Sequence, residues 1–151
     1  MNWNYIAGFF DGEGTFGKYN DNNGYKLSIS QSNEKVLKDI QVFTNIGHIY
    51  PLKKRKLYWK NAWVYYIAKE EDVYYFLNKI SNKLIVKKES VALALPLLER
   101  RVKKRKKQKI EIAKRIKRAK FLRRRGLSYR QIGKKLDIDW GYARRMILGL
   151  K

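Results

Sequence analysis

The sequence contains no cysteine, and this absence removes several kinds of chemistry at once. Without a thiol, the chain cannot form a disulfide, a zinc site with thiolate ligands or an iron–sulfur cluster, and it has no cysteine nucleophile. Histidine is almost absent as well. The single histidine, His48, follows Gly47 in a predicted strand, and we assign it no catalytic role.

Long apolar runs are also missing. The longest candidate, Val91–Leu98, is about half of the roughly 18 residues that a membrane span requires, and it contains Pro96. The first residues, Met1–Asn4, lack the charged start and the apolar core of a signal peptide. Hydrophobic residues nevertheless make up 44% of the chain, which is too many for a disordered basic tail. We therefore expect a folded, intracellular protein with no membrane partner.

Acidic residues are few, and the charge is distributed unevenly. The 151 residues include 36 Lys and Arg but 13 Asp and Glu, so the net charge is +23. Residues 1–100 carry a net charge of +5, and residues 101–151 carry +18. Neutralising phosphates with release of counterions is the usual use of such a basic segment. The charge favours a nucleic acid as the partner. The alternatives are that the basic segment binds an anionic lipid surface, that it only keeps the protein soluble, or that the protein coats RNA.

Hydrophobic periodicity predicts an α+β domain in the first hundred residues. In chain order, the expected elements are a helix (2–12), two strands (14–20 and 25–31), a helix (33–45), two strands (47–54 and 58–68) and a helix (70–80). The first two strands are joined by hairpin-turn chemistry at Asp21–Gly24, and Asn4 could cap the first helix. A further helix from about Ile85 meets Pro96, where we expect a kink or a break.

The segment Ile6–Phe16, with the sequence IAGFFDGEGTF, is the most informative stretch. Gly8 and Gly12 lie four residues apart and share one face of the helix, although each glycine costs about 1 kcal/mol relative to alanine there. Close approach of another backbone is the usual compensation. Glu13 stands at the C-terminal end of the helix, where the macrodipole disfavours an anion, and this indicates a cation partner such as a metal. The alternative is that the helix simply ends in a Gly-rich turn and that Glu13 is exposed without a cation partner.

This segment resembles the signature of the LAGLIDADG homing endonucleases, with Ile6 in the place of the first leucine and Glu13 in the place of the second acid. The order of predicted elements also matches that family's domain over residues 1–99. The resemblance implies an αββαββα fold with a four-stranded antiparallel sheet that binds DNA. Because the chain has one motif, it also implies a homodimer in which the Glu13 residues meet near the two-fold axis. The residues implied at the dimer interface are Ala7, Gly8, Asp11 and Gly12.

The resemblance further implies the residues of the active site. Glu13 is similar to the family's metal-binding acid, and the carbonyl of Gly12 would be a second ligand. Gln31 resembles a polar residue that orders water in the site, with a plain edge-strand residue as the alternative. Lys87 resembles the active-site lysine. If the alignment with the family is shifted by one residue, Lys88 takes this role. The alternative for Lys87 is a lysine at a helix end that is simply exposed to solvent.

Phosphodiester hydrolysis explains why these residue types would be needed. Carboxylate and carbonyl oxygens select Mg²⁺, and Ca²⁺ could bind without supporting cleavage. Two metal ions held by two Glu13 residues would clamp the attacking and leaving oxygens, while Lys87 could polarise the water or offset developing charge. For Asp11, which resembles the first acid of the motif, a capping or packing role is the better interpretation.

In this family the sheet lies in the DNA major groove, so its polar face should carry the residues that read bases. Alternation predicts that Tyr19, Lys26, Ser28 and Ser30 lie on this face, with Tyr50 and Tyr66 as further candidates. Basic residues near the second hairpin are expected to bind phosphates, which position the protein without specifying bases: Lys53, Lys54, Arg55, Lys56 and Lys60. Core packing is expected for about half of the aromatic residues Tyr58, Trp59, Trp63 and Tyr65.

Residues 119–151 contain a second informative pattern. Gly126 ends one helix, Ser128 can cap the next, Asp137 occupies a turn position that needs positive φ, and Asp139 can cap a last helix. This pattern resembles the helix-turn-helix of resolvase- and transposase-like domains, which implies reading of the major groove. The residues implied to contact DNA are Arg130, Trp140, Tyr142, Arg144 and Arg145. A plain helical pair for dimerisation is the alternative.

The sequence thus predicts an endonuclease domain (1–99), a basic helical connector (100–118) and a helix-turn-helix segment (119–151). The connector is expected to track phosphates, with a disordered linker as the alternative. The leading hypothesis is a Mg²⁺-dependent homing endonuclease that cuts both strands of a long pseudo-palindromic DNA target as a homodimer. A DNA-binding regulator that does not cut and an RNA-binding intron maturase are the alternatives. Double-stranded DNA is the expected partner, and RNA only for the maturase.

Overall fold

The computed structural model describes residues 1–19, 23–54, 56 and 58–150, with the side chains of Tyr19 and Asn23 left out. The predicted contacts of Tyr19 and Arg55, and most of the predicted turn at Asp21–Gly24, therefore lie outside the described residues. The chain divides into two compact units, Met1–Val102 and Lys103–Lys151. Within the described residues, no helix combines the length and the apolar character that crossing a membrane requires.

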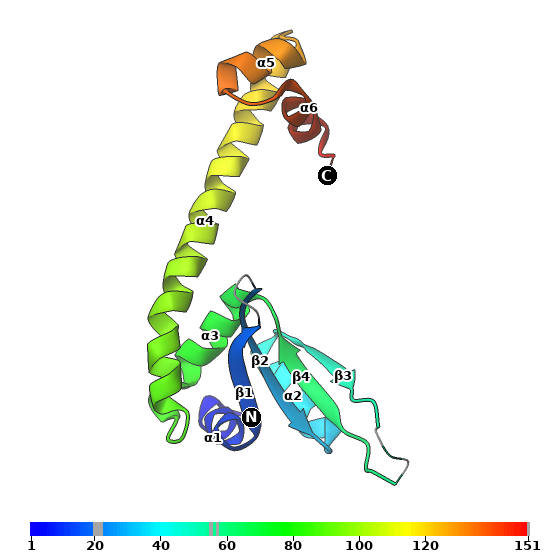
Figure 1. The fold of residues 1–151 in the computed structure, drawn as a ribbon, viewed down its shortest axis with the longest axis vertical. Helices are drawn as coiled ribbons and strands as arrows, with labels where there is room; N and C mark the ends of the chain where they lie inside the picture. Colours follow the sequence, from blue (N-terminus) through cyan, green and yellow to red (C-terminus); the bar gives the residue numbers. More distant parts are fainter. Residues whose placement is uncertain (20–22, 55, 57, 151) are drawn as a thin grey trace. The chain divides into compact units, whose positions relative to one another are not determined.

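The first unit has the predicted α+β fold and the predicted order of elements (Figure 1). Its elements are α1 (Trp3–Glu13), β1 (Gly14–Tyr19), β2 (Asn23–Gln31), α2 (Glu34–Thr44), β3 (His48–Pro51), β4 (Trp63–Ile67), α3 (Glu70–Ile80), η1 (Ser81–Lys83) and the first turns of α4 (Lys88–Arg124). The second hairpin has shorter strands than predicted. A cluster of like charges follows β3, and like charges that face each other across a ladder are destabilising.

The four strands form one antiparallel sheet in the order β1-β2-β4-β3. One face of the sheet is apolar, and residues such as Leu27 and Ile29 of β2 are completely buried there. Helices α1, α2 and α3 supply Ile6, Leu37 and Phe76 to the same core. The opposite face of the sheet carries polar side chains, because successive residues of a strand point to opposite sides.

The N-cap of the first helix lies two residues earlier than the sequence suggested. The side chain of Asn2, and not that of Asn4, accepts a hydrogen bond from the backbone N–H of Tyr5 at 2.9 Å. An Asn at this position satisfies one of the N–H groups that the first turn leaves without a helical partner. Asn4 therefore lies inside α1, and the prediction that it caps the helix is wrong.

Helix α4 continues through Pro96, so the break that was expected as the alternative to a kink does not occur there. Proline removes one helical hydrogen bond and frees the carbonyl of the residue four positions earlier, which is Ala92. Both Pro96 and Ala92 are exposed, so water can satisfy that carbonyl. The buried residues of this part of α4, among them Val91 and Leu98, lie on the other side of the helix and anchor it in the core of the first unit.

A buried carboxylate attaches α4 to the sheet and to α3. Glu70 is almost inaccessible to solvent, and its Oε1 lies 2.8 Å from Nε of Arg101. A Cβ on Gly24 of β2 would overlap the same Oε1, so the carboxylate would have to shift if this residue were not glycine. Arg101 therefore belongs to the first unit, although the sequence assigned it to the connector.

The second unit contains the rest of α4, α5 (Tyr129–Leu136) and α6 (Trp140–Leu148). Ala119, Ile132 and Ala143 form its small buried core, one from each helix. Ser128 and Gln131 form a capping box at the start of α5. Residue Asp137 has a φ of 53°, and Asp139 caps α6, as their predicted roles require. Gly126 follows the end of α4 with a φ of 85°. The four predicted end positions, Gly126, Ser128, Asp137 and Asp139, are thus confirmed by their backbone geometry.

Gly133 allows α5 and α6 to approach closely. A Cβ at this position would lie 2.7 Å from the carbonyl oxygen of Ile138 and 3.3 Å from Cα of Trp140. Backbone atoms of the turn and of the next helix fill that space, so a side chain could enter only if they moved. The helical pair therefore has a defined geometry that depends on a glycine.

Candidate active site and nucleic-acid interface

The C-terminal end of α1 is fixed to the segment that leads into α4. The carboxylate of Asp11 accepts the backbone N–H groups of Ile85, Val86 and Lys87 at 2.7, 2.9 and 2.8 Å. Lys87 in turn accepts the N–H of Val91 in the first turn of α4. Asp11 therefore caps an element that lies more than 70 residues further along the chain.

This cap changes the ionisation of Asp11. Burial by itself would raise the pKa of the carboxyl group, because a buried charge loses its hydration. The three N–H groups of residues 85–87, together with the positive charge of Lys87, favour the carboxylate more strongly, and the pKa of Asp11 is lower than its usual value. The capping role that was preferred for Asp11 agrees with this geometry, although the capped segment is distant in sequence.

Lys87 places its ammonium group at the same helix end. Its Nζ donates to the main-chain carbonyl of Asp11 and lies 5.8 Å from the centre of the Phe10 ring. The carbonyl groups at the C-terminal end of a helix attract a cation. Lys88, which was the alternative, is instead the exposed first residue of α4. Lys87 is therefore the lysine whose ammonium group lies at the end of α1.

Glu13 and Gly12 are exposed in the last turn of α1, the helix whose C-terminal end also receives the ammonium group of Lys87. Strand β1 begins immediately afterwards, with Gly14 opposite Ile29 of β2. Gln31 lies two residues beyond Ile29 and is therefore at the same end of the sheet as Glu13. Its Oε1 accepts the N–H of Ser32 at 2.8 Å. The fold thus brings the three residues that the resemblance implied to one end of one sheet.

The oxygen atoms at this helix end fit a hard divalent cation. Glu13 offers an exposed carboxylate, and carbonyl groups of the last helical turn have no partner within a helix. Carboxylate and carbonyl oxygens are the ligands that Mg²⁺ and Ca²⁺ prefer. Among the residues that the structure describes, no group of three or more acidic or histidine side chains is close enough to hold a metal within one chain.

The exposed face of α1 contains the two helix glycines. A Cβ added to Gly8 or Gly12 would have no neighbouring atom of the described chain within 4 Å. Ala7 is instead buried in the core of its own unit, and Asp11 is buried beneath residues 85–87. Of the four residues implied at the dimer interface, the structure therefore presents Gly8 and Gly12 to the outside and turns Ala7 and Asp11 inward.

The polar face of the sheet carries a row of side chains that crosses all four strands. The register pairs Thr15 with Ser28, Ser28 with Tyr66 and Tyr66 with His48. The hydroxyl oxygens of Thr15 and Ser28 are 2.8 Å apart, and Nζ of Lys26 lies 5.8 Å from the centre of the Tyr66 ring. Lys26, Ser28 and Tyr66 agree with the predicted positions. Thr15 was missed as a member of this row, because only the strand register reveals it, whereas His48 lies in its predicted strand.

A second row and a shallow hollow complete this face. Ser30 lies opposite Val64, and Val64 lies opposite Tyr50, whose ring is exposed. The hollow has a volume of about 320 Å³, and Thr15, Ser28 and Tyr66 are among the residues that line it. Its hydroxyl, ammonium and aromatic groups can donate and accept hydrogen bonds, which is the chemistry that base edges require.

The aromatic residues near the second hairpin divide as predicted. Tyr65 is completely buried, and Trp63 packs against the core, whereas Tyr58 and Trp59 are exposed. The hydroxyl group of Tyr65 donates to the carbonyl of Ile46 at 3.0 Å, and burial raises its pKa to about 12. The described basic residues of this hairpin are all exposed, as a phosphate contact requires: Lys53, Lys54, Lys56 and Lys60.

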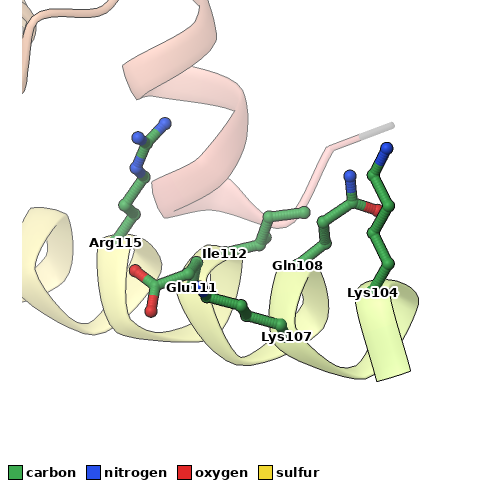
Figure 2. A pocket seen from close by; sticks show the side chains of 6 residues that line it. All are labelled: Lys104, Lys107, Gln108, Glu111, Ile112 and Arg115. Atoms are coloured by element: carbon green, nitrogen blue, oxygen red, sulfur yellow. The ribbon is translucent and has the colours of Figure 1, made fainter. Parts of the chain in front are cut away.

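The second unit has an exposed basic surface. Arg130 of α5 is exposed, as are the predicted contact residues of α6, which are Trp140, Tyr142, Arg144 and Arg145. A hollow of about 640 Å³ lies on α4 in this unit, and its lining residues come from one side of the helix (Figure 2). They are Lys104, Lys107, Gln108, Glu111, Ile112 and Arg115. This hollow includes none of the residues around Glu13, and its excess of cations suits a phosphate surface better than a catalytic pocket.

A family model described as a LAGLIDADG-like domain matches residues 2–81. This range includes α1 with Glu13, the whole sheet and α3. No curated protein matches the sequence.

Several solved structures are similar to this chain at low sequence identity. The LAGLIDADG meganuclease I-AabMI, which was crystallised bound to uncleaved DNA, has 19% identity and a TM-score of 0.52, over 67% of this chain and 38% of that chain. The homing endonuclease I-CvuI, crystallised with DNA in the presence of Mg, has 19% identity and a TM-score of 0.49, over 64% of this chain. The match spans 65% of the length of I-CvuI. An archaeal intron-encoded homing endonuclease, I-Vdi141I, complexed with DNA, has 24% identity and a TM-score of 0.45, over 97% of this chain and 94% of that chain.

Proposed function

Because the chain belongs to the LAGLIDADG family by the match of its residues 2–81, we propose that it is a site-specific endonuclease that cuts both strands of DNA. It acts as a homodimer with a divalent metal ion, and its target is long and approximately symmetric. The observation that carries this proposal is the pair of hydrogen bonds between Asp11 and Lys87, which holds an ammonium group beside the helix end that bears Glu13.

Each residue of the site has a chemical task in this reaction. Glu13 and the carbonyl of Gly12 hold the metal ion, which supplies charge neutralisation at the phosphate group when it is bound. The ammonium of Lys87 offsets negative charge that develops on the phosphate or polarises the attacking water. Gln31, at the neighbouring strand end, orders water molecules. A second chain supplies the second Glu13.

Recognition of the target divides between the two units. The polar face of the sheet reads bases through the row that includes Ser28 and Tyr66, and the exposed lysines of the second hairpin bind phosphates. In the second unit, α5 and α6 act as a helix-turn-helix, with Arg144 and Arg145 facing the DNA. The basic part of α4, which lies between the sheet and α5 along the chain, contacts the phosphate backbone.

The test is selection of bound and cleaved sequences from a randomised DNA library, in parallel with Mg²⁺ and with Ca²⁺. We expect cleaved products of one symmetric sequence family with Mg²⁺ and bound, uncut DNA with Ca²⁺. In the Glu13→Gln variant, cleavage should fall by at least 100-fold while the Kd for the target stays within about threefold. Glu89→Gln, which removes an exposed carboxylate in the first turn of α4, is the matched control and should cut like the wild type.

Three results would contradict the proposal or a part of it. Binding of one sequence without cleavage in any divalent metal would indicate the regulator instead. Preference for a structured RNA over duplex DNA would indicate the maturase. Cleavage that persists in Glu13→Gln would show that the metal site lies elsewhere.

A further inference from the structure

We propose that Ile85 and Val86 form a wall of the dimer interface, and that this wall in one subunit packs against the Tyr5–Phe9 pair of the other. The inference rests on the homodimer of the proposed function and assigns contacts beyond the glycine face of α1. It concerns association of the subunits and involves no residue that binds metal or DNA.

The first observation is the unusual exposure of a rigid apolar segment. The side chains of Ile85 and Val86 are 86% and 78% exposed. Their backbone N–H groups are held by the carboxylate of Asp11 at 2.7 and 2.9 Å, with η1 before them and α4 after them. Single exposed apolar residues need no explanation, but two adjacent aliphatic side chains in a fixed segment form a patch that a partner can cover. Little ordering entropy remains to be lost when such a patch binds.

The second observation is where this segment lies around α1. Each residue of a helix advances by about 100°, so Gly8 and Gly12 mark the middle of the exposed face, Asp11 lies on one flank and Phe9 on the other. The hydrogen bonds of Asp11 keep Ile85 and Val86 on its flank. On the opposite flank, the rings of Tyr5 and Phe9 stack with their centres 5.8 Å apart, and Tyr5 is 48% exposed. The glycine face is thus bordered by apolar groups on both sides.

The occupant that fits this face is a second copy of the chain. One chain contributes Glu13 as its acid at this helix end, and no cluster of three metal-binding side chains occurs among the described residues. A second Glu13 completes the site only if two α1 helices run side by side in the same direction. The bare Gly8 and Gly12 positions let two backbones approach closely.

Two-fold symmetry then decides which flanks meet. In an isologous pair, a rotation of 180° turns each flank of one helix toward the opposite flank of its partner. The flank that carries Ile85 and Val86 therefore faces the partner's Tyr5 and the partner's Phe9, and the same contact occurs a second time across the axis. Aliphatic side chains against aromatic rings bury apolar area on both subunits, which is favourable for association.

The first test is the dimer dissociation constant of the full-length protein by sedimentation equilibrium. The double variant Ile85→Ser/Val86→Ser should raise this constant at least tenfold. Val42→Ser changes a side chain on α2 that is 81% exposed, and it should leave the constant unchanged. The wild type and both variants should have the same circular dichroism spectrum, because the altered side chains lie outside the core.

The second test uses the absence of cysteine, which makes any introduced thiol unique. Tyr5→Cys and Val86→Cys are prepared separately, mixed and oxidised. We expect the mixed pair to form a disulfide-linked dimer faster than either variant alone, and faster than Val42→Cys mixed with Tyr5→Cys. A wild-type protein that stays monomeric with and without DNA would overturn the homodimer and the wall together. If the wild type is a dimer, either of two results would overturn the wall alone. One is an unchanged dimer dissociation constant in the double variant, and the other is the absence of preferential cross-linking between residue 5 and residue 86.

Discussion

Lys87 donates two hydrogen bonds to Asp11, one from its backbone to the Asp11 side chain and one from its side chain to the Asp11 backbone. Oδ1 of Asp11 accepts the backbone N–H of Lys87 at 2.8 Å, and Nζ of Lys87 donates to the main-chain carbonyl of Asp11. The two residues are 76 positions apart. One carboxylate therefore links the end of α1 to the start of α4 and keeps Lys87 at the helix end that bears Glu13.

Replacing Asp11 should cost both stability and activity. In Asp11→Ala, three N–H groups lose a charged acceptor, and the free energy of unfolding should fall by about 2–4 kcal/mol, since bonds to charged groups contribute about 1.5–3 kcal/mol each and water recovers a part. Urea unfolding measures this change. Cleavage by the folded fraction should also fall, because Lys87 loses its anchor. Asp39→Ala removes an exposed carboxylate on α2 that pairs with Lys35 and should change neither property. Wild-type stability of Asp11→Ala would contradict the capping role.

The free energy of unfolding at acidic pH should depend on the carboxylate of Asp11. The folded-state pKa of Asp11 lies below its ordinary value of 3.8, so its contribution to stability is present above about pH 4 and is lost as the pH falls through the folded-state pKa. Unfolding free energies of the wild type and of Asp11→Asn, measured from pH 7 to pH 2.5, should differ by a constant amount above pH 5 and converge below pH 4. A difference that persists unchanged at pH 2.5 would show that the carboxylate charge is not the cause.

Gly24 and Gly17 provide a matched pair for the buried carboxylate. A methyl group on Gly24 would collide with Oε1 of Glu70, so Gly24→Ala should lower the unfolding free energy by about 1–3 kcal/mol, the usual cost of overpacking. At Gly17 no described atom lies within 4 Å of the same methyl group, and Gly17→Ala should be neutral or slightly stabilising. Thermal melting of the two variants compares them directly. Equal melting temperatures would mean that Glu70 can move aside without loss.

Removal of one hydroxyl from the polar face should change specificity more than affinity. Ser28→Ala deletes the group that shares a contact of 2.8 Å with Thr15 in the row across the sheet. We expect the base preference to relax at one position of each half-site, by about 1–3 kcal/mol between the preferred and other bases. Lys60→Gln should instead weaken binding to all sequences alike, as a phosphate contact does. Binding to a panel of single-base target variants distinguishes the two patterns.

The second unit should contribute to affinity through phosphates. Replacing both Arg144 and Arg145 by Gln should reduce the slope of log K against log salt by up to about 1.8 per subunit, if each contacts one phosphate. Fluorescence anisotropy at several salt concentrations gives this slope. Lys35→Gln, an exposed change on α2, is the control. A slope that does not change would exclude these arginines from the phosphate surface.

The sequence by itself determined the features that depend on short separations along the chain. Hydrophobic periodicity predicted the order of helices and strands, and the IAGFFDGEGTF segment indicated both the family and Glu13. Local chemistry also predicted the caps at Ser128 and Asp139 and the positive φ of Asp137. Each of these depends on contacts within about four residues, so a short window of sequence contains the necessary information.

Only the tertiary structure decided the partners that are distant along the chain. The bonds from Asp11 to residues 85–87 and the ion pair of Glu70 with Arg101 require α1, α3 and α4 to be packed already. The row from Thr15 to His48 requires the register of all four strands, which alternation within one strand does not define. The continuation of α4 through Pro96 likewise depends on packing: the core holds one side of the helix, and solvent satisfies the other.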